Sequence, residues 1–466
     1  MRNYMNQTFM KEKKILPLVL SMALPMVLSM AVNSLYNIID SYFVARVNEN
    51  AITALSLVYP IQNLILSVAV GFGIGINAVV AYYLGAGQKE NADITASIGV
   101  LLSILHGIIL TVVCMLGMPA FLKMFHPDAQ VMELALEYSY RAFLFTIIIQ
   151  LYITYEKLYQ SIGKMKVSMI CMVAGFIVNI ILDPLMIFGI GFFPEMGIAG
   201  AAWATGIGQL VTFIVYLIFY YSYGKPAEIT RKNMHWNKDI LKKVYGIGIP
   251  AAFNMALPSF LISSLNGILS TFSEVYVLVL GAYYKLQTFI YLSANGMIQG
   301  IRPIISYNYG AGEHKRVKTI YHVSLRLAAG IMVIGTALSW MIPEQLIGLF
   351  TENSSTVDLG VKALHIISLS FIISAVSVTT SGALEALGKG FDSLIISLIR
   401  NAVVILPVAL VLSKVMGVNG VWYSFVVTEV VACVVSIIMY YRNVRGNEEE
   451  MDAVELLQSL QNSAEE

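Results

Sequence analysis

The residues best placed to do chemistry begin with an aspartate at the end of a long apolar stretch. Asp40 closes the segment Asn33-Ser-Leu-Tyr36-Asn37-Ile-Ile-Asp40. In a helix, the spacings of four and three residues put both asparagines and the acid on one face, with Tyr36 alongside. We therefore expect a carboxylate with two amide neighbours on the first apolar helix.

A second aspartate repeats this arrangement further along the chain. Asp183 lies in Asn179-Ile-Ile-Leu-Asp183-Pro184, one helical turn after an asparagine. An ionised carboxylate inside a bilayer is costly, so it needs a partner, a wet cavity or a proton. If Asp40 and Asp183 share a pocket, they are suited to bind H⁺ or Na⁺. The alternative is that each acid only makes structural hydrogen bonds, Asp40 at the end of its helix.

The composition indicates that the two acids lie on membrane-spanning helices. Of the 466 residues, 58% are hydrophobic and only 12% are charged, against about 25% charged in ordinary soluble domains. Apolar runs longer than about 20 residues predict membrane-spanning helices, and the alternation of an outer-membrane barrel is missing. The expected fold is an all-α polytopic membrane protein.

The charged and sulfur-containing residues exclude several other classes of protein. The net charge is +1, and the basic residues lie in short loops rather than in one stripe, so a nucleic-acid partner is not expected. The three cysteines lie singly in apolar runs, which favours small buried side chains over disulfides or metal ligands. The six histidines form no cluster of metal-ligand spacing.

Charged and Gly/Pro-rich breaks divide the chain into twelve predicted spans. Lys and Arg gather on one side of these spans, which predicts that both termini are cytoplasmic in the plasma (inner) membrane. The expected organisation is a cytoplasmic N-terminus (1–14), an N-lobe of six spans (15–223), a cytoplasmic linker (224–244), a C-lobe of six spans (245–441) and an acidic cytoplasmic tail (442–466). The spans are 15–41, 51–84, 92–117, 130–158, 167–191, 197–223, 245–272, 275–309, 317–341, 357–387, 391–415 and 418–441.

An internal repeat relates the two lobes. One shift of 225 residues superimposes the following residues: Pro25 and Pro250, Tyr59 and Tyr284, Gln62 and Gln287, Gly75 and Gly300, Tyr82 and Tyr307, Gly85-Ala86-Gly87 and Gly310-Ala311-Gly312. Since each repeat has an even number of spans, a pseudo-twofold axis along the membrane normal should relate them. Such repeats are typical of transporters that work by alternating access.

The two acids break this repeat. The counterpart of Asp40 is Leu265, and the counterpart of Asp183, aligned on the following proline, is Leu406. A purely structural acid would be expected in both copies. The asymmetry favours a coupling site confined to the N-lobe.

Prolines and other charges inside the spans add further candidates. Pro25 removes a backbone hydrogen bond from the first span and is the predicted hinge. Glu156, Lys157 and Glu385 are expected to extend toward the inner interface rather than to bind. The tentative substrate cavity comprises Tyr36, Asn33, Gln62, Lys285 and Arg302.

At this level of detail the chain resembles the multidrug and toxic compound extrusion (MATE) family, in particular its DinF-like branch. The most specific segments are Pro303-Ile-Ile-Ser-Tyr-Asn-Tyr-Gly-Ala-Gly312 and the two aspartate motifs. The resemblance implies drug/H⁺ or drug/Na⁺ antiport, a cation site at Asp40, Asn179 and Asp183, and bending at Pro25. Together with Asn37, which the helical spacing adds, Asp40, Asn179 and Asp183 are the predicted cation-coupling residues. NorM-like members of the family carry acids in the seventh and tenth helices that this chain lacks over 254–269 and 371–384, so coupling should belong to the first lobe.

The resulting expectation is a monomeric secondary transporter, not an enzyme, that exports amphipathic or cationic small organic compounds without a cofactor. Apart from Na⁺ at the aspartates, no metal is expected. The alternative is a lipid-linked saccharide flippase of the same superfamily. An intramembrane aspartyl protease is a weaker alternative, since the chain lacks a Gly-x-Gly-Asp pattern and such an enzyme would not explain the repeat.

Overall fold

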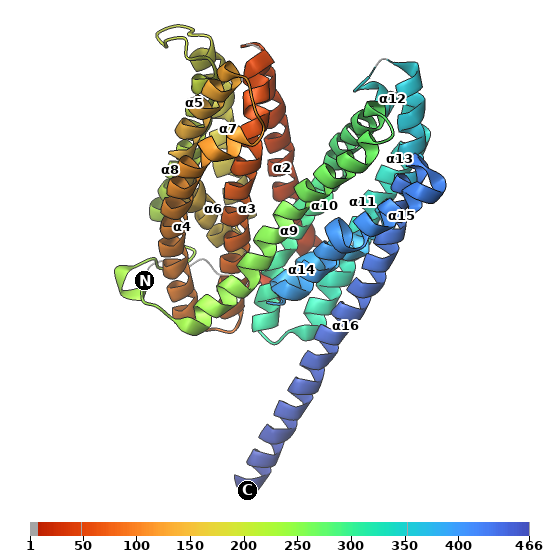
Figure 1. Ribbon diagram of the computed structural model, residues 1–466. Coiled ribbons are helices and arrows are strands. Elements are labelled where there is room, and N and C mark those ends of the chain that lie inside the picture. Colours follow the sequence, from red (N-terminus) through yellow and green to blue (C-terminus); the bar gives the residue numbers. More distant parts are fainter. Residues whose placement is uncertain (1–7, 48, 352, 466) are drawn as a thin grey trace. The chain divides into compact units, whose positions relative to one another are not determined.

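The protein is described by a computed structural model (Figure 1). It covers residues 8–47, 49–351 and 353–465, and side chains are described for 8–47, 50–351 and 353–443. Within these ranges the regular structure is helical throughout. The helices of the first repeat are α1 (Phe9–Glu12), α2 (Ile15–Ala45), α3 (Glu49–Gly85), α4 (Lys89–Lys123), α5 (Ala129–Phe143), α6 (Thr146–Ser161), α7 (Met165–Ile187) and α8 (Gly197–Ser222).

The second repeat follows after a short 3-10 turn, η1 (Arg231–Asn233). Its helices are α9 (Lys238–Ser270), α10 (Glu274–Gly310), α11 (His314–Met341), α12 (Pro343–Gly348), α13 (Ser354–Ala386), α14 (Gly390–Leu398), η2 (Ile399–Val403), α15 (Ile405–Met416) and α16 (Val418–Glu465). Helix α9 begins at Lys238 instead of the predicted 245, so part of the expected linker is helical. The backbone of the acidic tail is helical as well and extends α16 to Glu465.

The predicted all-α membrane fold is confirmed. Within the described ranges, eleven helices are long and apolar enough to cross a membrane, and the α5–α6 pair makes a twelfth if it counts as one span. That pair is bent by 46° at Leu144 and Phe145, where a single helix over 130–158 was expected. Neither residue is a proline or a glycine, so no residue at this position predicts the bend.

The eleventh span is also interrupted. A π-helical turn, η2, separates α14 from α15, and the amide of Val404 donates to the carbonyl of Ile399 (3.3 Å). In a regular α-helix, the carbonyl of Val403 would accept a hydrogen bond from residue 407. That residue is Pro407, which has no N–H. A wider turn at this point accommodates the missing hydrogen bond.

Contacts divide the chain into two compact units. Unit 1 contains residues up to Pro258 together with Thr288–Leu327 and Glu385–Phe391, and unit 2 contains Ser259–Gln287, Ala328–Leu384 and Asp392–Glu466. Unit 1 therefore includes segments of both repeats. The organisation into an N-lobe and a C-lobe stays a prediction.

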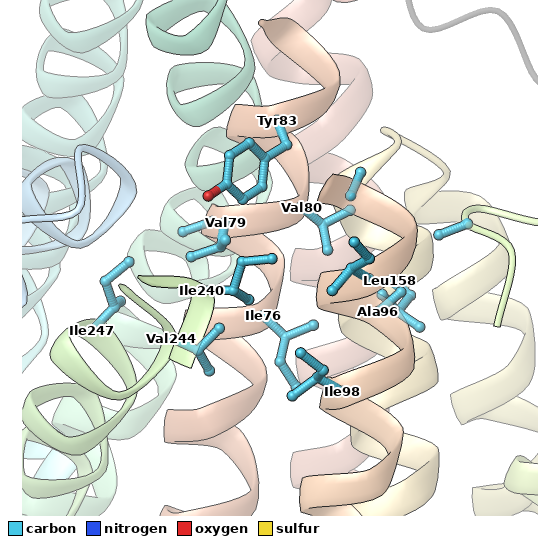
Figure 2. Packing of buried hydrophobic residues seen from close by; sticks show 14 of the residues in the cluster. Ile76, Val79, Val80, Tyr83, Ala96, Ile98, Leu158, Ile240, Val244 and Ile247 are labelled. Carbon is cyan, nitrogen blue, oxygen red and sulfur yellow. The ribbon is translucent and has the colours of Figure 1, made fainter. Parts of the chain in front are cut away.

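A hydrophobic core in unit 1 joins α3, α4 and α6 to the first turns of α9 (Figure 2). Its residues include Ile76, Val80, Ile98, Leu158 and Val244, all nearly inaccessible. Between membrane-spanning helices, such side chains stabilise the fold through close van der Waals packing. The start of the second repeat is thus anchored on helices of the first.

Within unit 1, glycines allow α3 and α10 each to pack closely against a helix of the other repeat. An ideal Cβ on Gly71 would lie 2.5 Å from the amide nitrogen of Ala252 in α9, and one on Gly296 would lie 2.7 Å from a side-chain carbon of Val27 in α2. Both glycines and both partners are related by the shift of 225 residues. The first membrane span of each repeat (α2 or α9) therefore packs against the second span (α10 or α3) of the other.

The same crosswise pattern closes the end of unit 1 at which α3 and α10 terminate. This end is expected to face the cytoplasm and is called the inner end. A Cβ on Gly85 would meet the carbonyl oxygen of Tyr307 at 1.9 Å, and one on Gly310 would meet that of Tyr82 at 2.0 Å. Only glycine permits two backbones to approach this closely. The two helices touch backbone to backbone here.

The segment before α2 is also held at the inner end. Met10 in α1 is fully buried, and its carbonyl accepts hydrogen bonds from Asn308 Nδ2 (3.1 Å) and Arg316 Nε (3.3 Å). Lys11 Nζ lies 2.9 Å from a carboxylate oxygen of Glu313. Helix α1 thus ties the first repeat to α10 and α11.

Candidate functional site

The predicted acids come together between helices of the first repeat. The carboxyl groups of Asp40 on α2 and Asp183 on α7 lie close enough to interact directly. Asp183 is fully buried. One oxygen of each, Asp40 Oδ1 and Asp183 Oδ2, is buried without a hydrogen-bond partner among the described residues. Two carboxyl groups in such contact favour sharing a proton or a cation, because two adjacent negative charges repel.

Asn179 joins this pair, as its spacing predicted. Its Nδ2 donates to Asp183 Oδ1 (3.3 Å) and to the hydroxyl of Thr205 on α8 (3.3 Å). Asn179 is 2% exposed, and its Oδ1 has no partner among the described residues. The asparagine therefore holds the acid to α8 and keeps one oxygen available as a ligand.

Tyrosines lie beside the acid pair. Tyr36 stacks on Phe176 with ring centroids 5.2 Å apart, and its hydroxyl interacts with Thr205. Gln62 Nε2 on α3 donates to the hydroxyl of Tyr138 on α5 (3.1 Å). Both tyrosines are within electrostatic range of the acids. Tyr36 and Gln62 were predicted from the sequence, whereas Tyr138, Thr205 and Phe176 were missed.

Asn33 and Asn37, the two asparagines of α2 expected beside Asp40, make no described contact with the acid pair. Asn37 is exposed, and its Nδ2 donates to the carbonyl of Asn33 in the same helix (2.8 Å). This hydrogen bond is local to α2. Asn33 is half-buried and takes part in it only through its backbone.

The candidates from the second repeat fall into different units. Arg302 on α10 belongs to unit 1, where its NH2 atom lies 2.6 Å from Glu385 Oε2. Lys285 belongs to unit 2, is exposed, and has its Nζ 5.6 Å from the centroid of the Phe350 ring.

The expectation that Glu156, Lys157 and Glu385 extend to the interface is wrong. Their side chains are only 3–6% exposed. Lys157 Nζ lies 2.8 Å from Glu156 Oε1, and Glu385 also accepts from Asn254 Nδ2 (2.9 Å). Each charge is matched by a partner inside the protein, so none needs to reach water.

Pro25 lies inside α2, which continues unbroken through it. The Ser29 hydroxyl donates to its carbonyl (2.8 Å). The helix between this proline and Asp40 thus connects the inner end to the acid pair.

Comparison with known proteins agrees with this geometry. The family model MatE matches residues 25–185 and again 250–411, two segments whose first residues are 225 apart. The chain belongs to the MatE family. It is a membrane transporter of that family and not an enzyme.

Curated relatives of this MatE chain are similar over most of their length. The multidrug export protein MepA of Staphylococcus aureus is 25% identical over 408 residues, covering 87% of this chain and 89% of that protein. MepA of Staphylococcus haemolyticus is 24% identical over 434 residues, covering 93% and 95%.

Solved structures share the fold. A MATE transporter crystallised in complex with MaL6 has a TM-score of 0.90 at 23% identity, covering 96% of this chain and all of that one. A multidrug resistance MATE transporter in an outward-facing conformation has a TM-score of 0.89 at 23% identity, covering 96% and 99%.

Proposed function

We propose that the protein is an antiporter that exports small organic, drug-like compounds across the plasma membrane by alternating access, driven by re-entry of H⁺ or Na⁺. Membership of the MatE family and the similarity to proteins named for multidrug export support this function. They do not favour the flippase alternative. Both termini would lie in the cytoplasm, and six spans in each repeat would form the two moving lobes.

The acid pair is the observation that carries the coupling proposal. Three other buried carboxylates in membrane-spanning helices have a cation beside them: Glu156 with Lys157 (2.8 Å), Glu385 with Arg302 (2.6 Å) and Glu429 with Arg400 (2.8 Å). Asp40 and Asp183 have each other instead, and no Lys, Arg or His is among their described contacts. A carboxyl pair of this kind is neutralised only by a proton or a bound cation.

Coupling then follows from what each occupant does to the pair. With a proton or Na⁺ bound, Asp40 and Asp183 attract a common charge and α2 is drawn toward α7. Without it, the acids repel each other and favour a site open to water or to a substrate. Pro25 removes a backbone hydrogen bond from α2 between Asp40 and the inner end. A movement of Asp40 relative to Asp183 can therefore bend α2 at this proline and shift the inner end of the helix.

The substrate would bind beside this pair. Tyr36 and Gln62 offer a hydroxyl, an amide and an aromatic face, which suits amphipathic or cationic compounds with mixed polar and apolar surface. Cation binding and substrate binding would compete for the same carboxylates, which is the requirement for antiport.

The test is Asp40→Asn in proteoliposomes with an imposed pH or Na⁺ gradient and a fluorescent lipophilic cation as substrate. The substitution keeps the shape and removes the charge, so gradient-driven export should fall by more than about tenfold while the protein still inserts. Asp128→Asn, an exposed acid at the start of α5, is the matched control and should transport normally. Undiminished gradient-driven export by the Asp40 variant would refute the coupling role.

A further inference from the structure

The second repeat carries a polar track on α10 that the first repeat does not have. Asn295, Gln299 and Arg302 follow spacings of four and three residues and therefore share one helical face. Under the shift of 225, the corresponding residues of α3 are Val70, Ile74 and Asn77. Two apolar residues and one amide in the first repeat are thus replaced by two amides and a guanidinium in the second.

The track leads from an exposed position to a buried ion pair. Asn295 is exposed, Gln299 is half-buried with its Nε2 3.7 Å from the sulfur of Met30 on α2, and the Arg302 side chain is 16% exposed. A row of amide and guanidinium groups facing lipid would be strongly disfavoured. This face of α10 is therefore expected to border water or a ligand.

The ion pair at the end of the track leaves donor capacity on its arginine. Arg302 contacts Glu385 through one terminal nitrogen (2.6 Å), while its buried Nε has no partner among the described residues. Glu385 is 3% exposed and its other oxygen is occupied by Asn254 Nδ2 (2.9 Å). An unpaired buried donor is uncommon and marks a place for water or a ligand.

The counterparts in the first repeat make no such pair. Asn77 Nδ2 donates to the carbonyl of Lys157 (2.9 Å), and Gln160, the counterpart of Glu385, donates to Glu156 Oε1 (2.6 Å). The Arg302–Glu385 pair is not needed to build a repeat of this fold, because the first repeat is built with amides at both positions.

We propose that Arg302, Glu385 and the α10 track form a second recognition site, which takes substrates that carry both a carboxylate and an ammonium group. This inference rests on the proposed export function and names a substrate class for it. The substrate carboxylate accepts hydrogen bonds from Arg302, whose planar guanidinium suits that group, and the ammonium lies toward Glu385.

Charge balance selects this class. The empty pair is neutral, so a simple anion or a simple cation would add an uncompensated charge to a site within the membrane. A zwitterion adds none. The amides of Asn295 and Gln299 provide further hydrogen bonds along the path to the pair.

The test compares two fluorescent probes of nearly equal size, Nε-dansyl-lysine, which is zwitterionic, and its methyl ester, which is cationic. Binding of each to the purified full chain in nanodiscs is measured for the wild type and for the double variant Arg302→Asn/Glu385→Gln. This variant carries the residues of the first repeat at both positions, so it should fold. We expect the wild type to prefer the zwitterion, and the double variant to lose about tenfold in affinity for the zwitterion only.

A matched control removes the other buried pair, with Arg400→Gln/Glu429→Gln in unit 2, and should keep the preference for the zwitterion. The inference is overturned if the wild type binds both probes equally, if the Arg302/Glu385 variant keeps the preference, or if the control loses it to the same extent. Gradient-driven transport of both probes is measured in parallel. If the wild type transports neither probe, the proposed export function is refuted, while the binding preference stands as a separate result.

Discussion

The crossing of α3 and α10 can be tested by adding a single methyl group. In Gly310→Ala the new Cβ would lie 2.0 Å from the carbonyl oxygen of Tyr82, whereas ordinary van der Waals contact begins at 3.4 Å. The two backbones must then separate by about 1.4 Å, and overpacking of this kind costs about 1–3 kcal/mol. If the helices part at the inner end during transport, the closed arrangement should lose population by about 5- to 150-fold.

Spin labels can measure that population. Cysteines at Glu90 and Lys315 occupy exposed, repeat-related positions beside the crossing, and three substitutions remove the native Cys114, Cys171 and Cys433. Double electron–electron resonance on reconstituted protein should show a larger fraction of long Glu90–Lys315 distances in Gly310→Ala than in the parent.

A matched alanine separates this effect from helix propensity. Gly246 lies in α9, and a Cβ there meets nothing within 4 Å. Gly246→Ala should therefore leave the distances unchanged and stabilise the helix by about 0.5–1 kcal/mol. Identical distance distributions in the parent and Gly310→Ala, or an equal shift in both alanine variants, would refute the argument.

Four further outcomes are expected. Asp183→Asn should reduce gradient-driven flux by more than about tenfold, and a flux equal to that of the parent would contradict its coupling role. Tyr138→Phe, which removes a hydroxyl that accepts a hydrogen bond near the acids, should reduce flux by about fivefold; an unchanged rate would show that this hydroxyl is dispensable. Pro25→Ala restores a backbone N–H and should slow transport without weakening substrate binding in an equilibrium assay, whereas faster transport would exclude the hinge. Arg316→Ala should speed tryptic cleavage after Lys13 and Lys14, because it releases the Met10 carbonyl. Lys11→Ala removes an exposed ion pair but keeps both of these cleavage sites, so it should leave that rate unchanged; equal effects of the two variants would contradict this ranking.

The length and apolar character of the spans were enough to predict the fold, because lipid forces each long apolar segment to satisfy its own backbone as a helix. The bend between α5 and α6 was not predictable, since Leu144 and Phe145 have no local property that breaks a helix. The π-turn η2 was not predicted either, although Pro407, four residues after Val403, accounts for it.

Site prediction succeeded where the chemistry is local in sequence and failed where it is not. Asn179 and Asp183 are one turn apart, so their hydrogen bond follows from spacing alone. Thr205 and Tyr138 lie beside the acid pair but belong to other helices, and no pattern around either residue predicts this. Glu385 and Arg302 likewise looked like separate charges, because only tertiary packing makes them partners.

The paired glycine contacts at the inner end have the form of an isologous dimer interface. Gly85 approaches the backbone of Tyr307 as Gly310 approaches that of Tyr82, so one patch meets its own copy. Before a duplication joined the repeats, a six-helix ancestor would already have carried both halves of this contact on one chain. The two copies differ elsewhere: the first holds the acid pair and the second holds the arginine–glutamate pair.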